Sequence, residues 1–372
     1  MKKLFIVSAT LFFFVLLFLG IYNFAFKPQN AAKIVTSPSA FSKEDKNKEK
    51  GVIREISSKE AHFPKVIRQG EKLRYFSEGK VFESEQDGSG ARPISGEDFG
   101  NVRNVQWSST GDLAVFSQEI EGKEHFFVFR AQGGKKESLK GGIDIACWEG
   151  SAVRLLYKYF DSASGRKTLN VADADGSNWK EIAEVKERFL EIAAIPKTNL
   201  VSFWNRGFAA EKTSLKIVPV IGGSVKEINL ERYGADYLWS PDGKKALVSS
   251  VDAPGSAKLE LGVVGLDGSY KSLGVPTLVH KAVWSADGRT VYYALPGGIP
   301  EEGKLPDDYW QKKFPVRDSF WKADIESGKK ERIVELDEIT ANFDVSQLLL
   351  TATENALLFT DRLSGKLYRI DL

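Results

Sequence analysis

Runs of alternating apolar and polar residues, separated by short polar turns, fill the chain from about residue 60 to its end. Alternation with a period of two predicts β-strands that bury one face. Four runs share one pattern: an apolar strand end with a tryptophan, a turn of small polar residues, and a second alternating strand. The copies occupy residues 105–117, 146–159, 237–250 and 282–295, with Trp107, Trp148, Trp239 and Trp284. These tryptophans are 41, 91 and 45 residues apart, which indicates a repeat of about 45 residues.

A second set of markers repeats with a similar period. Small turn dipeptides separate β-rich runs at Asp87-Gly88, Gly133-Gly134, Asp175-Gly176, Gly222-Gly223, Asp267-Gly268, Ser327-Gly328 and Ser364-Gly365. Their second glycines step by 46, 42, 47, 45, 60 and 37 residues. A β-propeller blade requires a four-stranded unit at this period, because one blade cannot bury both of its faces alone. The two sets predict an all-β, seven-bladed propeller over residues 61–372, with six or eight blades as alternatives.

The tryptophans have an expected place within each blade. The Trp motif would form the first hairpin and the glycine dipeptide the last. In the turn from Ser240 to Gly243, proline presets the backbone and glycine accepts the left-handed conformation that returns the chain. Trp239, just before that turn, is expected to fill the wedge between blades, where a large flat side chain buries most apolar area. We interpret all four tryptophans as structural.

The same turns carry a family resemblance. WSPDGK at 239–244, WSADGR at 284–289 and WSSTGD at 107–112 resemble the WD-like propeller repeat of the TolB type, which also occurs in propeller domains of prolyl oligopeptidase relatives. The resemblance spans roughly residues 60–372. It implies a β-propeller fold for that part of the chain.

The front of the chain is of a different kind. After Lys2 and Lys3, residues 4–26 contain no charge and are dominated by Phe, Leu, Ile and Val. This run exceeds the roughly 20 apolar residues that a transmembrane helix needs, so residues 1–27 are expected to form an uncleaved signal anchor. A cleavable signal peptide is the alternative, although its apolar stretch is normally shorter and ends at a small-residue site. Either way the remainder is expected on the extracytoplasmic side.

Charge and composition describe the stretch that follows. Residues 28–60 are expected to form a flexible tether, because the part up to residue 50 is poor in apolar residues and rich in Pro, Ser, Asn, Lys and Glu.

Residues 1–50 hold five surplus positive charges, so the overall net charge of +2 leaves about −3 for the rest. A surface of that charge is not expected to bind nucleic acid.

The cysteine and histidine residues further limit the class of protein and the kinds of site that it can hold. The one cysteine, Cys147, can form no internal disulfide and lies in an apolar run, which fits a buried side chain in a bacterial cell-envelope protein. His62, His125 and His280 are far apart and not at metal-ligand spacing. No GxSxG, Walker or GxGxxG motif occurs. We therefore expect no cofactor, no metal and no catalytic residue.

Three middle loops, each between the second and third strands of a blade, are candidates for binding and share one face. One of them, in the third blade, opens with Tyr159, Phe160 and Asp161. The sixth-blade loop at residues 296–317 is unusually long and causes the 60-residue step; long loops in compact folds are often functional. Its aromatic residues could instead plug the channel or pack on the rim. The fourth-blade loop pairs an aromatic ring with a guanidinium, which suits protein or sugar contacts. The binding candidates from these loops are Trp204, Arg206, Asp307, Asp308, Tyr309 and Trp310.

These features predict a membrane-tethered, extracytoplasmic propeller that recognises a protein or glycan of the cell envelope. The alternative is a propeller enzyme, a hydrolase or lyase, with acidic, Arg and Tyr side chains around a central channel. Carboxylates with a raised pKa at the channel mouth would favour the enzyme, whereas a broad aromatic and apolar patch would favour binding.

Overall fold

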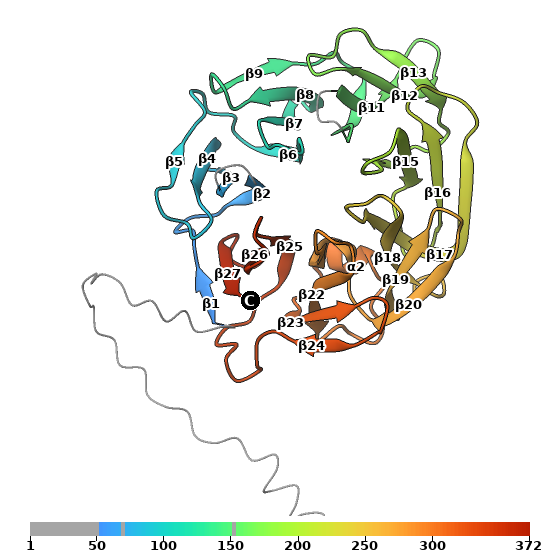
Figure 1. Cartoon of the computed structure of the whole chain (residues 1–372). Coiled ribbons are helices and arrows are strands. Elements are labelled where there is room, and N and C mark those ends of the chain that lie inside the picture. Colours follow the sequence, from blue (N-terminus) through green and yellow to red (C-terminus); the bar gives the residue numbers. More distant parts are fainter. Residues whose placement is uncertain (1–51, 68–70, 151–153) are drawn as a thin grey trace, which may run out of the picture. The chain divides into compact units, whose positions relative to one another are not determined.

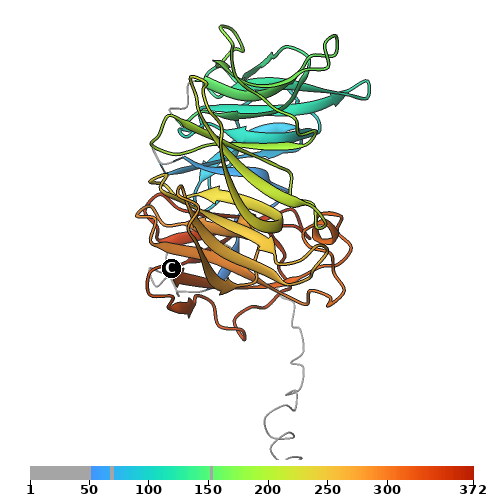
Figure 2. The same cartoon turned by 90° about the vertical axis from the view of Figure 1, so that its right-hand side faces the viewer.

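The computed structural model describes residues 52–67, 71–150 and 154–372, which are built almost entirely of β-strands. Five sheets have four strands each, and one sheet has seven. Within this part of the chain the sheets follow one another around a ring (Figure 1), which Figure 2 views from the side. The all-β class expected from the alternating pattern is confirmed, and the arrangement is that of a β-propeller.

In the four-stranded sheets before the last one, the strands run from the centre of the ring outward in chain order (Figure 1). The first three sheets are β2 (His62–Ile67), β3 (Lys72–Ser77), β4 (Lys80–Glu85) and β5 (Arg92–Pro93); β6 (Val102–Trp107), β7 (Leu113–Ile120), β8 (Lys123–Arg130) and β9 (Lys135–Ser138); and β10 (Ile143–Trp148), β11 (Arg154–Phe160), β12 (Lys167–Asp173) and β13 (Lys180–Glu184). The seven-stranded sheet is β14 (Leu190–Ala194), β15 (Leu200–Asn205), β16 (Lys212–Pro219), β17 (Lys226–Trp239), β18 (Lys245–Val251), β19 (Leu259–Gly265) and β20 (Tyr270–Val275). The next sheet is β21 (Ala282–Trp284), β22 (Thr290–Gly297), β23 (Arg317–Asp324) and β24 (Lys330–Arg332).

Strand β17 joins two four-stranded groups into the seven-stranded sheet. Its first part pairs with β16, from Lys226 opposite Ile217 to Asn229 opposite Ser214. Its last part pairs with β18, where Trp239 lies opposite Ala246. The same strand is therefore the outer strand of one group and the inner strand of the next.

The last sheet joins the two ends of the described chain. It contains β25 (Val345–Leu350), β26 (Ala356–Asp361) and β27 (Leu367–Asp371), and its outer strand is β1 (Ile53–Glu55), which pairs antiparallel with β27. Two expectations are corrected here. The tether assigned to residues 28–60 contains a paired strand, and Ser364-Gly365 forms the second hairpin of its sheet, not the last, because β1 supplies the fourth strand.

The four repeat tryptophans lie where one group of strands packs against the group before it. Trp148, Trp239 and Trp284 are buried in apolar clusters, as expected for structural side chains. Each of the four donates its indole N–H to a residue on a strand of the preceding group, at 2.7–3.0 Å. The turn after Trp239 also packs closely against the preceding group of strands. Gly243 has φ +70, and a Cβ there would meet the carbonyl oxygen of Pro196. Only glycine fits that position.

Cys147 is buried and free, and burial raises the pKa of its thiol to about 12. It is therefore a small core side chain, as expected. The expected anchor at residues 1–27 lies outside the described residues. Among the residues that are described, no helix is long and apolar enough to cross a membrane.

Candidate functional site

The long loop between β22 and β23 closes over the seven-stranded sheet. It carries a short helix, α2 (Asp307–Trp310), and a carboxylate oxygen of Asp307 accepts the backbone N–H of Ala209, in the loop after β15, at 2.9 Å. Two glycines allow this approach. A Cβ at Gly234, which has φ +57, would meet the ring of Pro306, and one at Gly207 would meet the backbone of Gly234. Two of the loops chosen from the sequence, those of the fourth and sixth blades, therefore meet in space.

A buried network anchors the loop. Tyr309 is only 2% exposed, and its hydroxyl donates a hydrogen bond to Asp344 at 2.8 Å. Asp344 also accepts the ammonium of Lys281 at 3.0 Å and the guanidinium of Arg362. Burial opposes the charge of Asp344, but Lys281 and Arg362 outweigh it and lower the pKa of its carboxyl. Arg362 donates to the backbone carbonyl of Tyr309 at 2.8 Å as well, so the loop is held to the last sheet.

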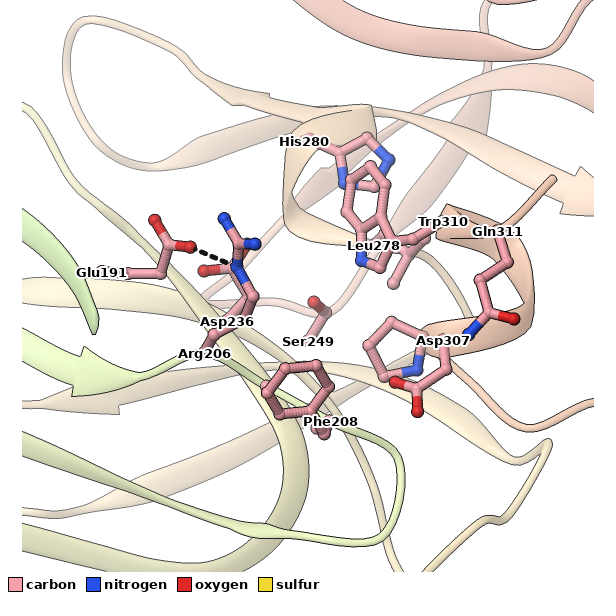
Figure 3. Close-up of a pocket in the computed structure, with 13 residues that line it drawn as sticks. Glu191, Arg206, Phe208, Asp236, Ser249, Leu278, His280, Asp307, Trp310 and Gln311 are labelled. Atoms are coloured by element: carbon pink, nitrogen blue, oxygen red, sulfur yellow. Dashed lines mark hydrogen bonds and ion pairs between the residues drawn. The ribbon is translucent and has the colours of Figure 1, made fainter. Parts of the chain in front are cut away.

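A cavity of about 480 Å³ lies between this loop, the loop after β15 and the inner strands (Figure 3). A short 3-10 turn, η1 (Val279–Lys281), contributes to one wall. The lining residues are Glu191, Arg206, Gly207, Phe208, Gly234, Asp236, Ser249, Leu278, His280, Pro306, Asp307, Trp310 and Gln311. The walls thus combine aromatic rings with planar charged groups, a composition typical of ligand sites.

The charged side of the cavity holds two carboxylates and one guanidinium. Nε of Arg206 donates to Glu191 at 2.9 Å, as Figure 3 shows. Asp236 accepts the indole N–H of Trp204 at 3.2 Å and the backbone N–H of Tyr237 at 2.9 Å. Burial, and after it the negative charge of Glu191, raises the pKa of Asp236 to about 7. Asp236 can therefore hold or release a proton near neutral pH.

The opposite side holds aromatic rings and unsatisfied polar atoms. The ring of His280 packs against the rings of both Tyr309 and Trp310, with centroids 5.6 and 4.4 Å away. Neither ring nitrogen of His280 has a hydrogen-bond partner among the described residues. The buried hydroxyl of Ser249, which lies beside Asp236 on the neighbouring strand, has none either. Burial, and after it the charge of Lys281, holds the pKa of His280 well below its usual value, so this imidazole is neutral. Unpartnered buried polar atoms in a cavity wall are available to a ligand.

The structure distributes the six candidates chosen from the sequence in different ways. Arg206, Asp307 and Trp310 line the cavity together. Trp204 is 4% exposed and Tyr309 2%, so both support the wall from behind. Asp308 lies outside the lining and pairs with Lys313 at 2.6 Å. Within the long loop Tyr309 packs inward, as the structural interpretation expects, whereas Trp310 stays 52% exposed. Binding through this loop stays a prediction.

Outside the candidate loops, sequence reasoning missed four polar residues of the cavity: Glu191, Asp236, Ser249 and His280. They come from β14, β17, β18 and η1, which are regular inner segments without turn or loop signals. One signal was available. Asp236 is an acidic residue within the apolar end of a Trp-containing strand, and a charge at such a position is costly unless it has a role.

No group of three or more His, Cys, Asp and Glu residues that could hold a metal ion occurs in the described part of the chain. No family model matches the sequence, and no curated protein does. Solved structures do match. An oligogalacturonate lyase in complex with manganese has a TM-score of 0.64 at 11% identity, over 89% of this chain and 95% of that one.

Two further matches are propellers as well. The β-propeller domain of the Trilobed protease from Pyrococcus furiosus has a TM-score of 0.55 at 14% identity, over 84% of this chain and 94% of that one. TolB from Acinetobacter baumannii has a TM-score of 0.49 at 13% identity, over 76% and 66%. At these identities the likeness to the lyase and the protease domain shows the β-propeller fold and leaves activity open. Membership of the TolB family stays a prediction.

Proposed function

We propose that this chain is a seven-bladed, membrane-tethered recognition module on the extracytoplasmic side, and that its cavity binds a glycan of the cell envelope. Five four-stranded sheets and one seven-stranded sheet shared through β17 support the blade count. The uncharged run at residues 4–26 behind Lys2 and Lys3 supports the tether.

The observation that carries the glycan assignment is the composition of the cavity. Phe208 and Trp310 offer aromatic faces, and Arg206, Glu191 and Asp236 offer planar donors and acceptors. A sugar ring presents an apolar C–H face and a rim of hydroxyls. The C–H face packs on an aromatic ring, whose face carries negative charge, while the hydroxyls need directed hydrogen bonds. The cavity supplies both on facing walls.

A glycan fits the surface better than a protein does. Protein interfaces need a contiguous face that buries aromatic and apolar side chains over a large area. The large exposed apolar side chains of the described residues come from many different strands and loops, although Ile221 and Val225 share one loop, and Phe189 and Trp310 lie at adjoining cavities. The others are Ile120, Phe160, Trp179, Leu336 and Leu363. A concave site with a half-exposed tryptophan instead suits a small, ring-shaped ligand.

Binding of soluble oligosaccharides to the full chain tests the recognition proposal. Titration calorimetry with oligomers of N-acetylglucosamine and of galacturonate should give saturable binding, and Trp310→Ala should weaken it by about tenfold or more with little change in melting temperature. Trp179→Ala is the matched control, because Trp179 is also 52% exposed and lines no wall of the cavity. If no oligosaccharide binds, or if both variants weaken binding equally, glycan recognition is refuted.

The tether has its own test. Intact-mass measurement of the membrane-extracted chain should give a species that keeps residues 1–26, because an uncharged run of that length anchors the chain. A species that begins between residues 20 and 35 would instead show cleavage. External protease should reach the propeller in spheroplasts, and full protection would reverse the proposed topology.

One observation favours an enzyme as the second candidate. Glu191, which is ion-paired with Arg206, shares the cavity with Asp236, whose pKa is about 7. Two carboxyl groups in unlike environments are the arrangement that acid–base cleavage of a glycosidic bond needs. Mass spectrometry of oligosaccharides incubated with the chain would decide it. Cleavage that Asp236→Asn and Glu191→Gln each abolish would support the enzyme, and binding without cleavage would refute it.

A further inference from the structure

A second cavity of about 440 Å³ adjoins the first. Glu191 and Arg206 line both cavities, so their ion pair forms the boundary that the two share. The other lining residues of the second cavity are Arg103, Asn104, Gln106, Glu124, Asp144, Ile145, Ala146, Arg188, Phe189 and Leu190. A ligand seated against Arg206 in the first cavity therefore needs to extend only past that ion pair to enter the second.

An aromatic stripe runs along the same path. Phe189 in the second cavity is 49% exposed and meets the ring of Phe208 in the first cavity edge to face, with centroids 6.0 Å apart at 74°. Trp310 lies on the wall of the first cavity across from Arg206 (Figure 3). Aromatic faces thus recur from one cavity to the next, beside charged groups at each step. A recurring site matches a ligand made of recurring units.

The second cavity has a firm floor beneath its exposed groups. The ammonium of Lys158, a side chain that is 1% exposed, donates to Asp144 at 2.8 Å and to the backbone carbonyl of Arg188 at 2.5 Å. The guanidinium of Arg188 lies over the ring of Phe189 at 5.1 Å and forms no ion pair with the described residues. Arg188 is therefore positioned by its backbone, while its donors remain free for a ligand.

We propose that the two cavities form one track for a linear oligosaccharide of several sugar units, which stacks on Trp310 and Phe208, passes the Glu191–Arg206 pair, and ends on Phe189 and Arg188. This inference rests on the proposed glycan recognition and adds the length and direction of the ligand. Each unit that reaches a further subsite adds contacts without a second loss of translational freedom, so affinity rises with chain length until the track is full.

Titration calorimetry of the full chain with ladders of oligomers, from one to six units, tests the track. One ladder is neutral, of N-acetylglucosamine, and one is acidic, of galacturonate, so that the sugar type preferred beside Arg188 is read from the same experiment. In the native chain the affinity for four units should exceed that for one unit by about tenfold or more. In Phe189→Ala and in Arg188→Gln this ratio should fall toward one.

Phe160→Ala is the matched control, because Phe160 is also an exposed phenylalanine and lines neither cavity; its ratio should equal that of the native chain. A flat ratio in the native chain, with single units still binding, overturns the track and leaves the glycan proposal standing. Binding of no sugar at any length overturns both. A length dependence for extended peptides in place of sugars overturns the glycan assignment, and an unchanged ratio in Phe189→Ala removes the second cavity from the track.

Discussion

The indole Nε1 of Trp148 donates to the backbone carbonyl of Gln106 at 2.9 Å, and Gln106 directly precedes Trp107, the repeat tryptophan of the sheet before it. Trp284 repeats the relationship with Leu238, which precedes Trp239, at 3.0 Å. Trp148 and Trp284 therefore each join their sheet to the previous one by a directed hydrogen bond as well as by packing. This explains why the repeat keeps a tryptophan at the end of the inner strand, where any large apolar residue would fill space.

Substitutions of Trp148 should separate the contribution of the indole hydrogen bond from that of packing. Trp148→Phe removes the indole N–H and keeps most of the ring, so it should lower the free energy of unfolding by about 1 kcal/mol. Trp148→Ala also leaves a cavity and should cost about 3–5 kcal/mol. Chemical denaturation of the full chain measures both. Trp179→Phe, at an exposed position, should change stability by less than about 0.5 kcal/mol, and equal effects of the two phenylalanine variants would contradict the role of the bond.

Pairing of β1 with β27 predicts a sharp boundary for truncation. A chain that begins at residue 51 keeps β1, whereas one that begins at residue 61 leaves the outer edge of the last sheet unpaired. The shorter chain also lacks Arg54, so Asp371 keeps only its ion pair with Arg369. The shorter chain should melt at a clearly lower temperature, because unpaired backbone groups and an uncovered sheet edge replace a ladder. Calorimetry of the two chains checks this, and identical melting temperatures would show that β1 contributes nothing to closure.

The buried network beneath the long loop should respond strongly to loss of its cation. The fully buried ammonium of Lys281 bonds to Asp318 at 2.6 Å and to Asp344 at 3.0 Å. Lys281→Met leaves the buried Asp318 without its cation and leaves Asp344 with Arg362 alone, so it should cost about 3–5 kcal/mol. Adding Asp318→Asn should recover part of that loss, since one unpaired charge is gone. A double-mutant cycle from urea unfolding measures the coupling, and purely additive losses would argue against the network.

Asp236 should make stability depend on pH near neutrality. Its pKa of about 7 in the folded chain lies above the ordinary aspartate value of about 3.9. Between these values the folded state binds a proton that the unfolded state has released, so the free energy of unfolding falls as pH rises from about 4 to about 7. Asp236→Asn removes this loss, and its advantage over the native chain should grow through that window to at most about 4 kcal/mol.

Thermal unfolding of both chains at about pH 5 and about pH 8 checks the sign. The asparagine keeps a side-chain oxygen that can accept the indole N–H of Trp204, as Asp236 does. The two chains therefore differ in the titrating carboxyl and not in this hydrogen bond. An advantage for Asp236→Asn that is equal at both pH values would show that the carboxyl does not titrate in this range.

The sequence alone was enough for the all-β class, the repeat and three residues that line the cavity. Alternating strands, Trp turns and glycine dipeptides recur along the chain because each sheet must satisfy the same local packing. The β class and the repeat can therefore be predicted from short stretches of sequence. Arg206, Asp307 and Trp310 were found because long or unusual loops are visible in the sequence. That Trp204 and Tyr309 face inward was not visible, since an aromatic residue in a loop has the same sequence signature whether it packs or protrudes.

Only the tertiary structure decided the rest. β1 and β27 are separated by more than three hundred residues, and no local pattern records that they pair. The cavity gathers Glu191, Asp236 and His280 from three separate inner segments, and the raised pKa of Asp236 arises from burial and from a neighbour 45 residues away. Strand formation depends on the periodicity of a few adjacent residues, whereas a site depends on which distant side chains are brought together and stripped of water, a property of the closed ring as a whole.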